Sequence, residues 1–326
     1  MIRLPLMRRI LPWFLAALFL STAGLTGCKK SAPDVPQELQ LYPWQGDLIE
    51  LLPHNYASWI YVDIASLRDQ PRIGELLASF IRYAPDAFTI ALMRGDEALF
   101  GISETDDAPA LSIVRSEYIS SELRASIQQG SLHGGEAPSE PDRLVGHRVT
   151  RNEAGTQWIA APTPNLLISG PEDALKRTLT SLQKVQATPG KQAGATVVFS
   201  LPFQSEAIPV LQTLMEQPAV REQTEAIQRV TGSLRIDESL ELVARFSMPE
   251  HGDPSSAAVL FAMFFEHTMP PLLSTWLNEE LAHWFSRQFV VSSEDSAAQR
   301  GVMLRAQLSP DALNLLLTLV EELLRE

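Results

Sequence analysis

Side chains that could act as acids, bases, nucleophiles or metal ligands are few and scattered in this 326-residue chain. The one suggestive cluster is Glu280 and His283, whose Glu-x-x-His spacing places two ligands on one face of a helix. Di-iron bundles use this spacing, but they need the motif twice together with further carboxylates. The sequence has no second copy, so we interpret both residues as the polar face of an amphipathic helix. We therefore expect no metal site and no cofactor.

Sequence motifs of the common enzyme classes are missing as well. The chain has no Gly-x-Ser-x-Gly, no glycine loop that would cradle phosphates and no paired-histidine zinc spacing. Arg94-Gly95-Asp96 matches an adhesion tripeptide, but its place between two predicted strands favours a turn. The sequence thus predicts a protein that is not an enzyme. An enzyme with a dispersed site near Glu280 and His283 is the alternative.

Cys28 is the only cysteine in the chain, and it follows a short apolar segment. Arg3, Arg8 and Arg9 supply positive charge, and Ile10–Leu25 is almost wholly apolar. This arrangement is typical of a secretory signal peptide. A membrane-spanning helix needs roughly 20 apolar residues, so the segment is short for one.

The four residues Leu25-Thr26-Gly27-Cys28 resemble the lipobox of bacterial lipoproteins. In that family the cysteine thiol receives diacylglycerol, the signal is cut before the cysteine, and the new N-terminus is acylated. The resemblance covers residues 1–28 only. It implies signal cleavage between Gly27 and Cys28, fatty acylation of Cys28 and attachment to a membrane. In enteric lipoproteins an Asp after the cysteine marks inner-membrane retention, and Lys29 in its place favours the outer membrane. Both the periplasmic and the surface face stay open.

The net charge of the chain limits the kinds of molecule that it can bind. The whole chain carries −13, and the first 27 residues contribute three arginines and no acids, so the rest carries −16. A body this acidic is repelled by nucleic acid, which we therefore exclude as a partner. Because the single cysteine is expected to be lipidated, the fold has no disulfide and depends on its apolar core, which a chain of this size can build.

Composition divides the chain into four parts. Residues 1–27 form the signal peptide, and residues 28–55 form a lipidated tether and linker with prolines at positions 33 and 36. Two α+β regions follow, at residues 56–186 and 195–326. Between them, Ala187–Gly194 has the composition of a linker.

The two α+β regions show signs of an internal duplication. Similar residues recur 138 positions apart at both ends of the unit: Pro71, Leu76 and Ala174-Leu175 correspond to Pro209, Leu214 and Ala312-Leu313. We predict an α+β fold of two duplicated lobes, each an antiparallel sheet with helices packed on one face. Each lobe is expected to follow the order β-α-β-β-α-β-β-α. The clearest alternation of apolar and polar residues in the chain is at 240–246, where Leu and Phe alternate with Glu241 and Arg245. One face of this sheet should therefore be exposed to water.

An apolar segment in the second region stands out. Ala257–Phe265 contains no polar residue, so we predict a helix that is buried on several sides and is ended by Pro270-Pro271. The aromatic residues on it and on the next helix are candidates for lining an apolar ligand pocket, although such a stripe is more often core. These are Phe261, Phe264, Phe265, Trp276 and Trp284.

The leading functional hypothesis is a lipid-anchored cell-envelope protein that binds or scaffolds, without catalysis. Its expected partners are the membrane, reached through the anchor, and an envelope protein. The alternative is a periplasmic carrier or sensor of an apolar ligand, using a pocket in the second region.

Overall fold

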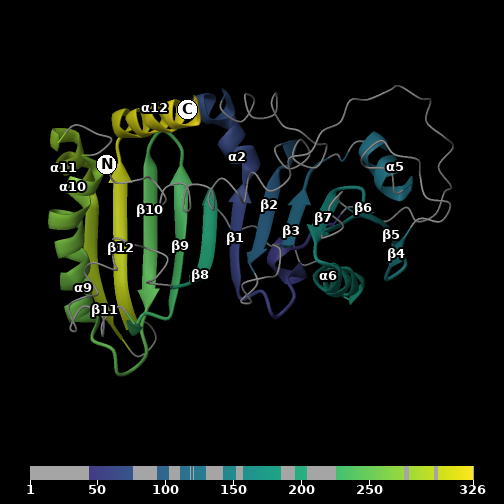
Figure 1. Ribbon diagram of the computed structural model, residues 1–326, viewed down its shortest axis with the longest axis horizontal. Coiled ribbons are helices and arrows are strands. Elements are labelled where there is room, and N and C mark those ends of the chain that lie inside the picture. Colours follow the sequence, from purple (N-terminus) through teal and green to yellow (C-terminus); the bar gives the residue numbers. More distant parts are fainter. Residues whose placement is uncertain are drawn as a thin grey trace, which may run out of the picture. The chain divides into compact units, whose positions relative to one another are not determined.

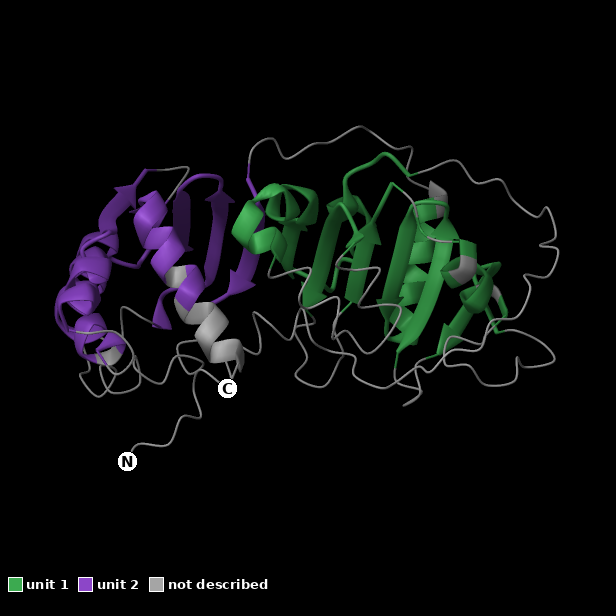
Figure 2. Ribbon diagram, turned by 90° about the horizontal axis from the view of Figure 1, so that it is seen from above, with its two compact units in different colours: residues 1–193 green, residues 194–326 purple. Residues whose placement is uncertain are grey.

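The computed structural model describes residues 44–75, 94–102, 111–117, 119, 121–129, 142–151, 157–184, 195–203, 225–274, 279–296 and 300–325. These residues form an α+β protein whose strand pairs are all antiparallel (Figure 1). The chain divides into two compact units, residues 1–193 and 194–326 (Figure 2). The boundary lies inside the segment predicted as a linker.

The first unit is a sheet of seven strands in the order β1-β2-β3-β7-β6-β5-β4. Its strands are β1 (Ser58–Asp63), β2 (Glu97–Ile102), β3 (Leu111–Arg115), β4 (Arg143–Leu144), β5 (His147–Arg151), β6 (Trp158–Thr163) and β7 (Leu166–Gly170). Its helical elements are η1 (Leu48–Leu51), α2 (Ile64–Asp69), α5 (Ser121–Gln129) and α6 (Glu172–Lys184).

Both faces of the central strands in this unit are buried. On β2, the consecutive residues Ala98 and Leu99 are fully buried, although neighbouring side chains of a strand point to opposite faces. Helix α5 covers the face of Ala98 with Leu123 and Ile127. The other face meets the η1 region, and α6 packs against η1, β6 and β7. The prediction that helices cover only one face is therefore wrong for this unit.

A hairpin turn divides one stretch of the first unit into two strands. The sequence predicts a single strand over residues 144–151, but a tight turn at Val145 and Gly146, which have φ of 51° and 82°, divides it into β4 and β5. A two-residue hairpin turn of this kind needs left-handed backbone at both central positions. Glycine adopts it readily, whereas a β-branched valine is unusual there, so the sequence did not signal the turn.

The second unit is a sheet of five strands in the order β8-β9-β10-β12-β11. Its strands are β8 (Val197–Pro202), β9 (Arg229–Ile236), β10 (Leu240–Ser247), β11 (Phe289–Asp295) and β12 (Arg300–Leu308). Its helical elements are α9 (Pro254–Met263), the π-helical η3 (Phe264–Thr268), α10 (Met269–Leu273), α11 (Glu279–Ser286) and α12 (Pro310–Arg325). The sequence also predicts a helical segment over about residues 205–228, ahead of β9, and most of this segment lies outside the described residues.

The predicted alternation of β10 is confirmed. Leu242 pairs with Leu234 and Ala306, and Phe246 pairs with Val230 and Val302, so apolar residues of three strands share one face. Helix α9 packs on this face through Ala257 and Phe261. Arg245 lies on the opposite, polar face, where it pairs with Glu294.

The apolar segment of the second unit differs from its prediction in two ways. It packs on the sheet with one side only, because Val259 and Met263 of α9 are 59% and 52% exposed. The two prolines do not end it either, since η3 continues α9 and leads into α10. The π-helical turn pairs Met269 N–H with the Phe264 carbonyl directly before the two prolines, which have no N–H to donate.

Gly301 in β12 gives a direct test of this sheet. Its φ of 154° is unfavourable for other residues, and a Cβ there would overlap the carbonyl oxygen of Phe246 on β10. We expect Gly301→Ala to lower the free energy of unfolding by at least ~2 kcal/mol in urea titrations. Gly146→Ala is the matched control: its φ is also positive, but the space around it is open, so it should cost only about 1 kcal/mol. Equal losses would contradict this account of the β10–β12 contact.

Candidate functional site

The residues predicted to carry the lipid lie outside the described part of the chain. Gly27 and Cys28 belong to the segment 1–43, so cleavage and lipidation stay predictions. The nearest described feature is the contact that the first described residues make with the first sheet. We call this the N-terminal dock and define it as residues 44–51 together with Asn165 and Arg115.

The N-terminal dock is held by a reciprocal pair of hydrogen bonds. The backbone N–H of Trp44 donates to Asn165 Oδ1, and Asn165 Nδ2 donates back to the Trp44 carbonyl, both at 2.8 Å. Thr163 Oγ1 donates to the same Oδ1 at 2.9 Å, which fixes the orientation of the amide. All these groups are buried. One side chain from the β6–β7 turn thus satisfies both backbone groups of the first described residue.

Apolar burial accompanies this pair. Trp44 is 7% exposed, Leu48 and Leu51 are fully buried, and Asp47 caps η1 by accepting from Ile49 N–H. Each buried leucine contributes roughly 1.5–3 kcal/mol, against about 1 kcal/mol net for a hydrogen bond. Burial therefore holds the segment, and the hydrogen bonds set its position. The sequence assigned residues 44–55 to the linker, but these contacts make them part of the folded unit.

A second clamp on the N-terminal dock comes from Arg115 at the end of β3. Its Nη1 donates to the Gly46 carbonyl at 2.7 Å, and its Nη2 forms an ion pair with Glu97 on β2. Tyr61 on β1 hydrogen-bonds to the same carboxylate. Burial, with smaller effects from Glu97 and Asp63, raises the pKa of Tyr61 above its ordinary value, so the phenol stays protonated. A carboxylate bound on both sides in this way positions the chain.

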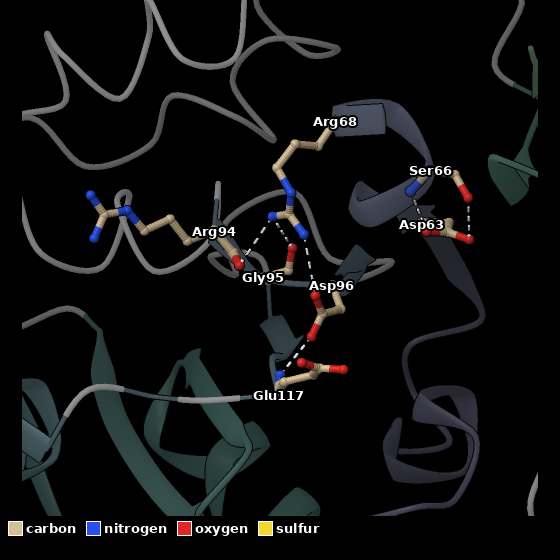
Figure 3. Close-up of polar contacts among 7 residues, drawn as sticks. All are labelled: Asp63, Ser66, Arg68, Arg94, Gly95, Asp96 and Glu117. Atoms are coloured by element: carbon tan, nitrogen blue, oxygen red, sulfur yellow. Dashed lines mark hydrogen bonds and ion pairs between the residues drawn. The ribbon is translucent and has the colours of Figure 1, made fainter. Parts of the chain in front are cut away.

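The Arg94-Gly95-Asp96 tripeptide is also tied into the first unit (Figure 3). Asp96 Oδ1 pairs with Arg68 at 3.3 Å, and its Oδ2 accepts from Glu117 N–H at 2.5 Å. Arg68 also donates to the carbonyls of Arg94 and Gly95. Both carboxylate oxygens of Asp96 are used inside the protein, while the Arg94 side chain points away from the cluster (Figure 3). The tripeptide thus joins α2 to the start of β2.

The two residues of the Glu-x-x-His motif lie exposed on α11, as the polar-face interpretation predicts. In the described residues, no three His, Cys, Asp or Glu side chains gather where they could hold a metal ion. His147 is half-buried on β5, and burial lowers its pKa, which favours the neutral imidazole.

The aromatic residues predicted to line a pocket are placed in three ways. Phe261 and Phe265 pack on the sheet, with ring centroids 4.6 Å from Phe246 and 4.5 Å from Phe289. Phe264 contacts Phe265 edge-on at 5.3 Å. Trp284 is 37% exposed, and Trp276 lies outside the described residues. The packed rings serve as core, and a ligand pocket at these residues stays a prediction.

The sequence missed the dock residues Asn165, Arg115 and Glu97. The pair Pro164-Asn165 between two strands signals a turn, but nothing in it signals a partner 121 positions away. The three strand ends Asp63, Glu97 and Arg115 lie in register across β1, β2 and β3, and this register depends on the tertiary fold.

Comparisons with known proteins leave the chain without a family. No family model and no curated protein matches it. Among solved structures it is similar to crystal form III of the treponemal protein TP0453, with 11% sequence identity over 84% of this chain and 97% of that chain. The TM-score of 0.43 is too low to carry an argument about function. In the described part of the chain, every helix is too short or too polar to cross a bilayer.

The reciprocal pair in the N-terminal dock predicts a graded mutant series. Asn165→Ala should lower the free energy of unfolding by roughly 2–4 kcal/mol, because it orphans two buried backbone groups. Asn165→Asp keeps the acceptor but places a buried carboxylate oxygen against the Trp44 carbonyl, so its effect should be at least as large. Hydrogen exchange at residues 44–51 should accelerate in the same order. Asn55→Ala, at an exposed asparagine that accepts from Arg177, should change stability by less than ~0.5 kcal/mol. Unchanged exchange in Asn165→Ala would contradict the assignment.

Proposed function

We propose that this chain is a lipid-anchored protein of the bacterial cell envelope whose folded body binds or scaffolds an envelope partner. The observation that carries the proposal is the lipobox-like Leu25-Thr26-Gly27-Cys28 after a positively charged, apolar leader. A thiol at this position receives two acyl chains, and the amine of the same cysteine takes a third. Because one chain binds only marginally and several bind durably, such an anchor holds the protein at the membrane.

The start of the folded body supports a tethered arrangement. Fifteen residues, Lys29–Pro43, separate Cys28 from the first described residue, Trp44. An extended chain of this length spans at most ~50 Å. The body therefore works within a thin layer next to its membrane. Lys29, in the position where enteric lipoproteins carry a retention Asp, favours the outer membrane.

A binding role without catalysis fits the chemistry of the described residues. Two half-buried ion pairs, Glu97 with Arg115 and Glu294 with Arg245, each join two strands of one sheet. These charged groups hold the sheets together, which is a structural use. We propose an envelope protein as the partner and no cofactor.

We further propose that the two units descend from one duplicated unit. Support comes from strand order: β1-β2-β3-β7-β6 in the first unit has the same connectivity as β8-β9-β10-β12-β11 in the second. Helix α6 begins at Glu172 after β7, and α12 begins at Pro310 after β12, 138 positions later. The β4–β5 hairpin is then an addition to the first unit.

The anchor is tested by removing its thiol. Cys28→Ser should abolish incorporation of labelled palmitate and leave a precursor with its signal attached, because neither the transferase nor the peptidase has its substrate. The wild-type chain expressed in the same cells is the control. Palmitate label retained on the Cys28→Ser protein would show that the lipid is attached elsewhere and would refute the proposal.

A further inference from the structure

Exposed apolar side chains concentrate in one part of the described protein. The four large hydrophobic residues that are more than a third exposed are Val259, Met263, Trp284 and Val290. All four belong to the second unit, and Val290 is the most exposed at 63%. Val290 on β11 pairs with Arg305, so it lies on the sheet face that α9 does not cover. Val259 and Met263 belong to α9, which packs over the other face of β11 and β12.

Strand β11 is the outermost strand of its sheet (Figure 1). Within the described residues it pairs with β12 alone, so one side of its backbone is left without a strand partner. An unpaired edge is a template for another strand, and proteins block it with charged residues, Pro, a bulge, a very short strand or a covering helix or loop. β11 is seven residues long, its sequence FVVSSED has no Lys or Pro, and its register to β12 is continuous. Helix α9 packs on one face of β11, and two acids lie at the end of the strand.

The charges on this edge are neutralised within the unit. Glu294 accepts from Arg245 Nε at 2.7 Å and from its Nη2 at 3.3 Å. Asp295 lies 3.6 Å from Arg300. The chain after the signal carries −16, so two copies repel each other over most of their surface. At β11 both Glu294 and Asp295 are paired with arginines of the same unit, so the repulsion between two copies is reduced at this edge.

From these observations we propose that the outer edge of β11, together with the exposed side of α9, is a self-association surface where a second copy of this chain pairs antiparallel through its own β11. The edge needs an extended strand as its partner, and β11 itself is a strand of matching length. Pairing about Ser292 aligns all seven residues and places the acidic end of each strand opposite the apolar end of the other. The α9 helices of both copies then lie on one side of the joined sheet, where Val259 and Met263 can contact each other.

The choice of a second copy rests on the proposed function, because a lipid anchor confines all copies to one membrane surface. Confinement raises the effective concentration of a partner that carries the same anchor and the same tether length. A two-fold axis through Ser292 makes the contact isologous, so it closes at a dimer and does not continue into a filament.

Cysteine crosslinking of the full-length protein in its native membranes tests the dimer. With Cys28 lipidated, Ser292→Cys adds the sole free thiol of the chain. Mild oxidation should then give a disulfide-linked dimer at least tenfold above Ser121→Cys, a matched control at an exposed serine of α5. The parent chain without an added cysteine gives the background. Dimer yield from Ser292→Cys at the Ser121→Cys level would overturn the proposal.

A second substitution separates specific pairing from collision. Val290→Glu, introduced beside Ser292→Cys, should lower the dimer yield at least tenfold, because pairing about Ser292 sets position 290 opposite Glu294 of the other copy, and like charges directly opposite each other repel. Val290→Thr keeps a β-branched side chain and should keep the dimer. An unchanged yield with Val290→Glu would overturn the proposal. So would a protein that stays monomeric and whose retention on phosphatidylcholine vesicles falls with Val290→Glu, since the edge would then dock on lipid.

Labelled palmitate on the same samples separates this inference from the proposed function. Label without dimer refutes the self-association surface alone. Absence of label refutes the lipid anchor, and the chain carrying both Cys28→Ser and Ser292→Cys then reports on the edge by itself.

Discussion

The contact of Trp44 with Asn165 holds the first described residues of the chain against the first sheet. Two hydrogen bonds of 2.8 Å position the chain, and burial of Trp44, Leu48 and Leu51 supplies most of the free energy. Arg115, at the end of β3, adds a hydrogen bond to the Gly46 carbonyl. The N-terminal dock thus joins residues 44–51 to β3 and to the turn before β7, and both strands lie in the interior of the first sheet.

The two units bury their sheets differently, and this difference has consequences for binding. In the first unit α5 lies on one face while η1 and α6 lie on the other, which explains why β7 is buried along its whole length. In the second unit α9 covers one face, while the opposite face carries Arg245 and Arg305. An apolar helix with only one layer beneath it leaves Val259 and Met263 in solvent. Interaction surfaces are therefore more readily found in the second unit.

The sequence predicted the regular elements well, because period-two and period-3.6 patterns report directly on buried faces. Strand β10 lies within a residue of its predicted position, and so do helix α6, predicted over residues 171–185, and the start of helix α12, predicted at residues 309–310. The prediction that α9 is buried on several sides was wrong, because an all-apolar sequence does not show how many layers pack around a helix. The sequence also failed to predict the N-terminal dock, since the polar residues Asn165 and Arg115 act on segments far away in the chain. Composition placed residues 44–55 in a linker, although three of their large apolar residues are buried.

The central claim is that the mature protein begins at a lipidated Cys28. Mass spectrometry of the N-terminal peptide, from protein extracted from its own membranes, measures this directly. The account predicts a peptide that starts at Cys28 and carries a diacylglyceryl thioether together with an acyl group on its amine. A peptide that starts at Met1, or one that starts elsewhere with Cys28 unmodified, would contradict it.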